Sequence, residues 1–229
     1  MKAVGIVLSF GYYLVMALFL GSYIWRAVMW MKDERNRAAV HRGRMSPLVF
    51  LKAAGDIISF RRLLMVNDVL WIGELAFHAS FVLIVLRHLR YFLEPVPGWV
   101  EALQPLGVLA GYVFPLALVY IFIRKIVIER VKYISPYNLL LLSLLVLLGV
   151  TGLLLKTVFR TDITAVKAFA LGIVTFRPAP APDSVLFIIH FVLFLVLVAY
   201  LPTHVFSAPL SILDARQREK GFRGVIHEK

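Results

Sequence analysis

Four histidines lie inside long apolar stretches of this 229-residue sequence: His78, His88, His190 and His204. An ionisable side chain inside a membrane-spanning segment is costly, so each of the four is a candidate functional residue. Neutral imidazole is a good axial ligand for haem iron, and two axial histidines leave no coordination position open for oxygen chemistry. Paired histidines therefore indicate haems that carry electrons. The other two, His41 and His227, lie in basic hydrophilic segments and are expected at the surface.

The spacing of the four histidines predicts two pairs at two depths. On a helix, the step from His78 to His88 spans about 15 Å and about 80° around the axis. The step from His190 to His204 spans about 21 Å and about 40°. On antiparallel neighbouring helices His78 would lie level with His204, and His88 with His190. The unequal steps do not match, and a bend at Pro202 would absorb part of the difference.

Basic residues near these histidines suit a cofactor that carries acidic groups. Arg87 and Arg90 flank His88 and are candidate partners for haem propionates, although they could equally extend to the lipid headgroups. Lys156 and Arg160 end a later apolar stretch on the same side of the membrane. They are candidate partners for a propionate or a quinol headgroup, with interfacial anchoring as the alternative.

Two other features bear on a cofactor site. Glu74 precedes His78 by one helical turn and could handle protons, or simply be solvated. Gly149 and Gly152 allow the close approach of another helix or of a haem, and the sequence does not distinguish these.

Five apolar stretches must position these residues, and each is long enough to cross a bilayer core of about 20 residues. They cover residues 3–25, 69–93, 102–123, 133–155 and 184–213. Backbone polar groups cannot remain unpaired in lipid, so all five are predicted to be helices. Pro115 is predicted to kink the third and Pro202 the fifth. The first stretch is too long for a cleaved signal peptide.

The composition agrees with a membrane protein and excludes other classes. Hydrophobic residues make up 61% of the chain, charged residues 17%, and the mean hydropathy is +0.84. A soluble domain of this length could not bury so much apolar surface. The net charge of +12 does not indicate nucleic-acid binding, because the basic residues lie between apolar runs. With no cysteine, this chain cannot hold a thiolate-bound iron–sulfur cluster or a covalently attached haem.

The distribution of positive charge predicts the orientation. Most of the 25 Lys and Arg residues fall in the segment 26–68, after the third stretch, or in the tail 214–229. The positive-inside rule therefore places the amino terminus outside the cytoplasmic membrane of a prokaryote and the carboxy terminus inside. Within the cytoplasmic loop 30–68, residues 48–65 mix apolar and basic residues and are predicted to form one helix in the membrane interface.

Three segments resemble the gamma subunit of respiratory nitrate reductase and its wider family of membrane dihaem cytochromes b. That family includes the membrane subunits of heterodisulfide-reductase-like and Dsr-type complexes. The segments read GELAFHASFVLIVLRHL (Gly73 to Leu89), NLLLLSLLVLLGVTGLLL (Asn138 to Leu155) and HFVLFLVLVAYLPTHVFSAP (His190 to Pro209). The two-histidine motif of the first segment and the HVFSAP ending of the third are the most specific parts.

The resemblance implies an all-α, five-helix membrane bundle with two haems b stacked between its second and fifth helices. It implies that His78 and His204 bind the inner haem iron, and that His88 and His190 bind the outer one. It also implies quinol oxidation near the outer haem and electron delivery to a cytoplasmic iron–sulfur subunit, and through it to a catalytic subunit. The first loop is longer and more basic than in the nitrate reductase subunit, so a heterodisulfide-reductase-like partner is equally compatible.

The sequence thus predicts an electron-transfer subunit of a respiratory oxidoreductase, with residues 1–213 as the cytochrome domain and 214–229 as a basic cytoplasmic tail. Menaquinol or ubiquinol would be its substrate, and it shares catalysis with its partners. No individual catalytic residue is predicted. The reverse direction, quinone reduction, has the same sequence requirements. A histidine relay in a transporter or proton channel without haem is the alternative from a different class, and a cofactor-free anchor would leave the four histidines unexplained.

Overall fold

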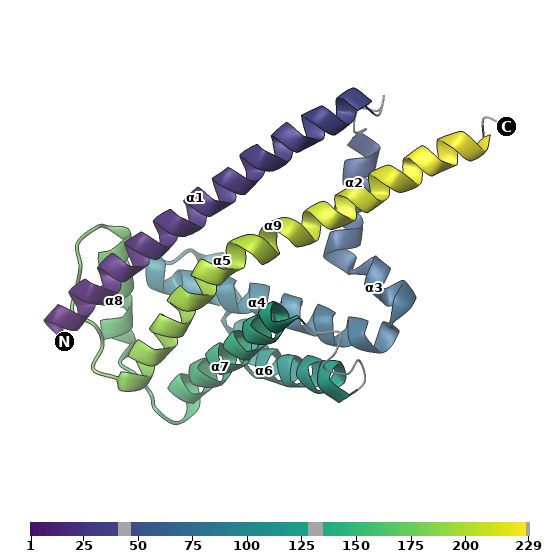
Figure 1. Ribbon diagram of the computed structural model, residues 1–229. Coiled ribbons are helices and arrows are strands. Elements are labelled where there is room, and N and C mark those ends of the chain that lie inside the picture. The colour runs from purple at the N-terminus through teal and green to yellow at the C-terminus, as the bar shows by residue number, and fades with distance from the viewer. Residues whose placement is uncertain (41–46, 128–134, 228–229) are drawn as a thin grey trace.

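The computed structural model describes residues 1–40, 47–127 and 135–227 (Figure 1). All regular secondary structure in these residues is α-helical, which confirms the predicted all-α class. The helices of the described chain are α1 (Lys2–Val40), α2 (Pro47–Ser59), α3 (Arg61–Val66), α4 (Asp68–Phe92), α5 (Gly98–Ala102), α6 (Gln104–Val127), α7 (Pro136–Thr157), α8 (Ile163–Val174) and α9 (Val185–His227).

Five of these helices are long and apolar enough to cross a membrane: α1, α4, α6, α7 and α9. They match the five apolar stretches of the sequence, so the prediction of five candidate spans is confirmed. The chain is a multi-pass membrane protein. α1 and α9 continue well beyond their apolar parts, and α9 runs through Leu213 without a break. The boundary predicted between the cytochrome domain and the tail therefore lies inside one helix.

The spanning helices form a series of packed neighbours: α4 on α6, α6 on α7, α7 on α9, and α9 on α1. At the first contact a Cβ on Gly73 would lie 2.6 Å from Cδ1 of Tyr120, and the Tyr120 hydroxyl donates to the Val69 carbonyl at 2.8 Å. At the second, Gly149 meets the ring of Phe114, so a helix approaches closely at this glycine. In the described chain α4 and α9, which carry the histidines, are not an extensively packed pair.

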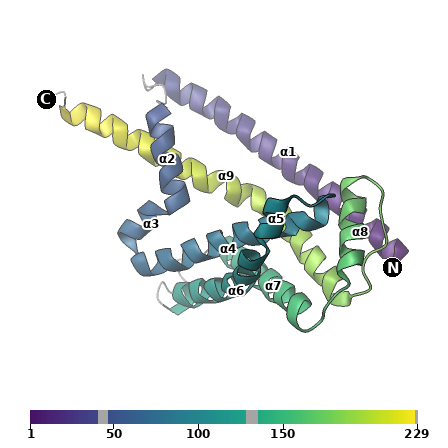
Figure 2. The same ribbon diagram turned by 180° about the vertical axis from the view of Figure 1, so that it is seen from behind.

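The prolines predicted to kink two spans lie within continuous helices. Pro115 lies in α6, and Pro202 and Pro209 lie in α9. α9 changes direction part-way along its length in both views (Figures 1 and 2). Such a bend is expected of a helix that contains proline, because proline lacks an N–H and its ring crowds the preceding turn. The kink at Pro115 stays a prediction.

The connection between α1 and α4 differs from the single helix predicted over residues 48–65. It forms two helices, α2 and α3, with Phe60 between them in the left-handed region at φ 49° and ψ 31°. This conformation is unfavourable for a residue with a Cβ, and it ends α2. The Trp71 indole donates to the Ser59 carbonyl at 2.8 Å and fixes the break against α4.

α2 is held against α9 by a buried carboxylate. Asp56 is only 3% exposed and accepts hydrogen bonds from Nη2 of Arg216 at 2.8 Å and from Nε of Arg62 at 3.4 Å. The hydrogen bond from Arg216 is the main cause of a lowered pKa of the Asp56 carboxyl. Four large apolar side chains of α2 stay exposed: Leu48, Phe50, Leu51 and Ile58. One face of α2 therefore packs on protein, and the rest suits a membrane interface.

The short helix α8 was not predicted from the sequence. It buries Phe169 and Ile173 in a cluster with Leu8 of α1 and Phe187 of α9. The hydroxyl of Tyr13 in α1 also donates to the Ile173 carbonyl at 2.9 Å. α8 thereby ties the start of α1 to the start of α9.

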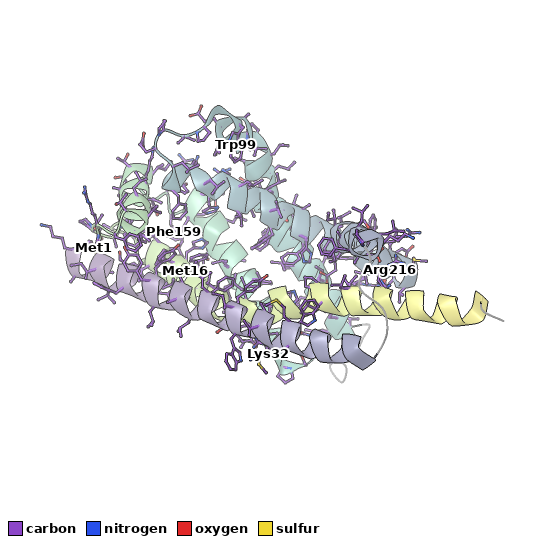
Figure 3. The ribbon with its side chains drawn as sticks, turned by 90° about the horizontal axis from the view of Figure 1, so that it is seen from above. Met1, Met16, Lys32, Trp99, Phe159 and Arg216 are labelled. Carbon is purple, nitrogen blue, oxygen red and sulfur yellow. The ribbon has the colours of Figure 1, made fainter. Side chains whose placement is uncertain are left out.

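These contacts give the molecule two distinct ends. The N-terminal end contains the start of α1, α8 and the end of α7, and the α2 end contains α2, α3 and the later part of α9. Figure 3 shows Met1 and Phe159 towards the first end and Arg216 towards the second. α4 runs from α3 towards α8, so its two histidines lie at different levels between these ends.

Candidate haem and quinol site

The structure brings the four histidines together in the two pairs expected from depth. His190 lies within electrostatic range of His88, and His204 lies within range of His78. The first pair belongs to the N-terminal end and the second to the α2 end. Each pair has one member in α4 and one in α9, two helices that do not pack extensively against one another in the described chain.

The rings of His78 and His88 are oriented by their own helix. Nδ1 of His78 lies 2.8 Å from the Glu74 carbonyl oxygen, and Nδ1 of His88 lies 2.7 Å from the Ile84 carbonyl oxygen. A carbonyl oxygen can only accept, so Nδ1 carries the proton in both rings. In a neutral imidazole this leaves the Nε2 lone pair free, which is the state required of a metal ligand.

His190 is oriented by a neighbouring helix instead. Its Nδ1 lies 2.9 Å from Oγ1 of Thr151 in α7, a residue that is 9% exposed. The next residue, Gly152, faces the same ring, and a Cβ there would lie 3.1 Å from Cε1 of His190. The sequence predicted a close approach at Gly152, and the group that approaches is the ring of His190. The absence of a side chain at Gly152 leaves room for this ring.

The histidines at the α2 end have aromatic and charged neighbours. The rings of Phe60 and Phe77 lie 4.5 Å and 4.4 Å from that of His78, measured between centroids. The Glu74 carboxylate lies 3.8 Å from Nδ1 of His78 and 3.5 Å from Nζ of Lys125. Glu74 is thus paired with a lysine of α6 rather than simply solvated. His204 lies within electrostatic range of both members of this ion pair.

Arg87 and Arg90 both hydrogen-bond to the first residue of α6. Nε of Arg87 and Nη1 of Arg90 both donate to Oε1 of Gln104, at 3.1 Å and 3.0 Å. Arg90 also donates to the Tyr91 hydroxyl and lies over that ring, 4.6 Å from its centroid. These partners are uncharged, and Nε of Arg90 is buried without a hydrogen-bond partner. Both guanidinium charges also act on His88.

Lys156 joins the two arginines, and Arg160 does not. The charge on Lys156 lies within range of those on Arg87 and Arg90, and its Nζ lies 5.5 Å from the centroid of the Tyr112 ring. We name Arg87, Arg90 and Lys156 the cation cluster. In the part of the chain that the structure describes, no carboxylate forms an ion pair with it. Arg160 is exposed beyond α7, and its predicted quinol contact stays a prediction.

The residues present fit a haem at each histidine pair. The rings of His78 and His88 donate from Nδ1 and leave Nε2 available, and Nδ1 of His190 lies beside a hydroxyl that can accept its proton. The two members of each pair lie on helices that are not extensively packed on each other. The cation cluster, in which Nε of Arg90 has no hydrogen-bond partner, would stabilise an acidic group. No group of three or more His, Asp or Glu side chains in the described residues forms a separate metal site.

Comparison with known proteins gives two relatives of the same description. Over 150 residues, covering 58% of this chain and 44% of the relative, the chain is 37% identical to the Hdr-like menaquinol oxidoreductase cytochrome b-like subunit of Archaeoglobus profundus. Over 149 residues, covering 58% and 45%, it is 30% identical to the protein of that name from Archaeoglobus fulgidus. The chain is homologous to these subunits. It spans less than half of the length of these relatives, and no protein-family model matches it.

These relatives correspond to the heterodisulfide-reductase-like branch of the resemblance found in the sequence, and neither name mentions nitrate reductase. Sequence reasoning missed three residues that shape the site: Thr151, Gln104 and Phe60. A threonine in an otherwise apolar span was the one available signal, since a buried hydroxyl needs a partner. Nothing in the sequence indicated that Gln104 would accept from two arginines.

Proposed function

We propose that this chain is a dihaem cytochrome b subunit of a menaquinol-oxidising membrane complex. The observation that carries the proposal is the pairing of four intramembrane histidines. Two of them have their Nδ1 proton engaged by a carbonyl oxygen and their Nε2 free, and the Nδ1 of a third lies beside the Thr151 hydroxyl. The homology to cytochrome b-like subunits of Hdr-like menaquinol oxidoreductases supports the same conclusion. A proton relay would not require the rings to be fixed in this tautomer.

In this proposal His88 and His190 hold a haem at the N-terminal end, and His78 and His204 hold one at the α2 end. Each haem, when bound, supplies a one-electron carrier. The arginines of the cation cluster would bind propionates, because guanidinium donors suit carboxylates and their own partners are neutral. Lys156, at the edge of the cluster, would meet a propionate or the oxygen of a quinol headgroup.

The charge distribution supports an N-terminal end that faces outward and an α2 end that faces the cytoplasm. Quinol would then be oxidised near His88 and His190, with its protons released outside and its electrons passed inward. The basic cytoplasmic segments and α2 would receive a soluble iron–sulfur subunit, which connects to the catalytic subunit. The complex would lie in the cytoplasmic membrane of a prokaryote and exchange electrons with the quinone pool.

The experiment is a pyridine-haemochrome assay and a dithionite-reduced difference spectrum on the full chain, purified in detergent after expression with haem supplied. We expect two haems b per chain, and reduction of both by a menaquinol analogue. A folded, colourless protein would overturn the cytochrome assignment and favour the histidine relay. Two haems that a quinol cannot reduce, but that pass electrons to a quinone, would reverse the direction.

A further inference from the structure

We propose that Thr151 is a positioning residue that sets the redox potential of the outer haem through His190. This inference rests on the proposed function, because it concerns a ligand of the haem at the N-terminal end. Thr151 lies in α7, which carries none of the four histidines. The inference therefore gives α7 a role that neither the sequence resemblance nor the relatives assign.

The hydrogen bonds of Thr151 decide which partner donates. Its Oγ1 lies 2.8 Å from the Leu147 carbonyl oxygen and 3.1 Å from the Leu148 carbonyl oxygen, both in its own helix. Those oxygens can only accept, so they engage the single hydroxyl proton of the threonine. The lone pairs of Oγ1 are then left to accept the Nδ1 proton of His190, 2.9 Å away.

This arrangement strengthens the acceptor. A hydroxyl that donates to a carbonyl is polarised and becomes a better acceptor for the next hydrogen bond in the chain. An acceptor at Nδ1 raises the basicity of a ligating imidazole, which favours the more positively charged state of the metal. The Thr151 hydroxyl should therefore stabilise ferric iron and lower the midpoint potential of the outer haem.

Gly152 completes the arrangement by leaving room for the ring. A Cβ at this position would approach Cε1 of His190 to 3.1 Å, a tight contact that the ring could relieve only by moving. Such a movement would alter the 2.9 Å hydrogen bond to Thr151. The two adjacent residues of α7 thus fix both the proton and the orientation of one ligand.

The test is a spectroelectrochemical titration of the full-length protein carrying Thr151→Val, which removes the hydroxyl with little change in shape. We expect two haems, with the midpoint of one raised by a change of about 10-fold in its ferric-to-ferrous ratio, or about 59 mV for one electron. The other midpoint should not move, which also shows that the variant is folded. Thr151→Ser keeps the hydroxyl and should therefore show the wild-type midpoint potentials.

A second measurement addresses the ring itself. Gly152→Ala should shift the low-spin electron paramagnetic resonance signal of the same haem, because the angle between its two imidazoles changes. Gly111→Ala in α6 is the matched control, since a Cβ there meets nothing within 4 Å. If Thr151→Val leaves both midpoints unchanged in a two-haem protein, the inference is wrong while the proposed function stands. Wild-type protein without haem would refute the proposed function itself.

Discussion

The two ends of the molecule hold their histidines in different electrostatic surroundings. At the N-terminal end Arg87 and Arg90 lie within electrostatic range of His88, and Lys156 lies within range of both arginines. The described hydrogen-bond partners of the two arginines are the neutral side chains of Gln104 and Tyr91. At the α2 end the lysine near His204 is paired with Glu74, and two phenylalanine rings flank His78. Positive charge is thus left without a counterion at one end and is matched at the other.

This difference indicates different tasks for the two ends. Like charges held together in a low-dielectric region are costly unless an anion offsets them. The N-terminal end therefore suits a ligand that brings negative charge, such as a propionate. At the α2 end the lysine charge is already matched within the protein by Glu74, and the rings of Phe60 and Phe77 pack beside that of His78. A change confined to one end can therefore be measured against the other end as a reference.

The largest effect should come from removing one histidine of α4 at a time. His88→Ala should lose the haem of the N-terminal end and keep the other, because the second pair shares no ligand with it. His78→Ala should do the reverse. The haem-to-protein ratio, measured by pyridine haemochrome, should fall from two to one in each variant, with different remaining spectra. Loss of both haems from either variant would show that the two sites are not separate.

The next effect concerns the cation cluster. Arg90→Gln removes a guanidinium group whose Nε is buried without a hydrogen-bond partner. We expect the variant to retain the outer haem about 10-fold less tightly. Transfer of haem to apomyoglobin measures this loss, and the haem at the α2 end should transfer at the wild-type rate. Arg160→Gln is the matched control, because Arg160 is exposed and outside the cluster. Equal transfer from Arg90→Gln and wild type would contradict the assignment.

A smaller effect is expected at the α2 end from Asp56→Asn, which replaces the carboxylate that Arg216 and Arg62 contact. We expect α2 to lose about 1–2 kcal/mol of local stability, since Arg216 is 24% exposed and the pair is partly screened. Hydrogen exchange of the α2 amides measures this change. The haem midpoints should not move, because the described hydrogen bonds of the Asp56 carboxylate come from arginines and not from a histidine.

The same carboxylate predicts a pH dependence. The pKa of Asp56 is lowered in the folded protein, so its stabilisation is complete above the ordinary value near 3.8 and is lost as the pH falls through the lowered value. The difference in α2 exchange between wild type and Asp56→Asn should therefore be constant near neutral pH and shrink in acid. A difference that persisted fully in acid would assign the effect to something other than the carboxylate charge.

The smallest effect is expected from Tyr137→Phe. The hydroxyl of Tyr137 donates to the Tyr200 carbonyl at 3.1 Å, the Tyr200 hydroxyl donates back at 3.2 Å, and the rings stack at 4.4 Å. Losing one of these two hydrogen bonds should lower the thermal midpoint by about 2 °C or less. The outer haem should be unaffected. A shift of its midpoint would mean that the two ends are coupled through α7.

Features that depend only on position along the chain could be predicted from the sequence. Five spans follow from hydropathy alone, and the level of each histidine follows from its distance along a helix. The contact of Thr151 with His190 could not be predicted, because it depends on how α7 is rotated against α9. The same holds for Gln104, whose two donors lie in a different helix.

Two local features also escaped prediction, for separate reasons. α8 is twelve residues long, too short to be recognised as a span. Its role depends on contacts with α1 and with the start of α9, which are far apart in the sequence. The break at Phe60 carries no glycine or proline signal. It depends on the Trp71 hydrogen bond and on the ring of His78, both contributed by α4.

The contacts of α1 have a consequence for the order of assembly. A Cβ on Gly5 would lie 2.2 Å from the Ala179 carbonyl oxygen, and the Tyr13 hydroxyl bonds to Ile173. α1 thus packs against segments that are made more than 150 residues later. Until α8 and the segment that follows it are synthesised, α1 lacks these packing partners. The N-terminal end, including the surroundings of His190, is therefore completed only after α8 and α9 have been synthesised.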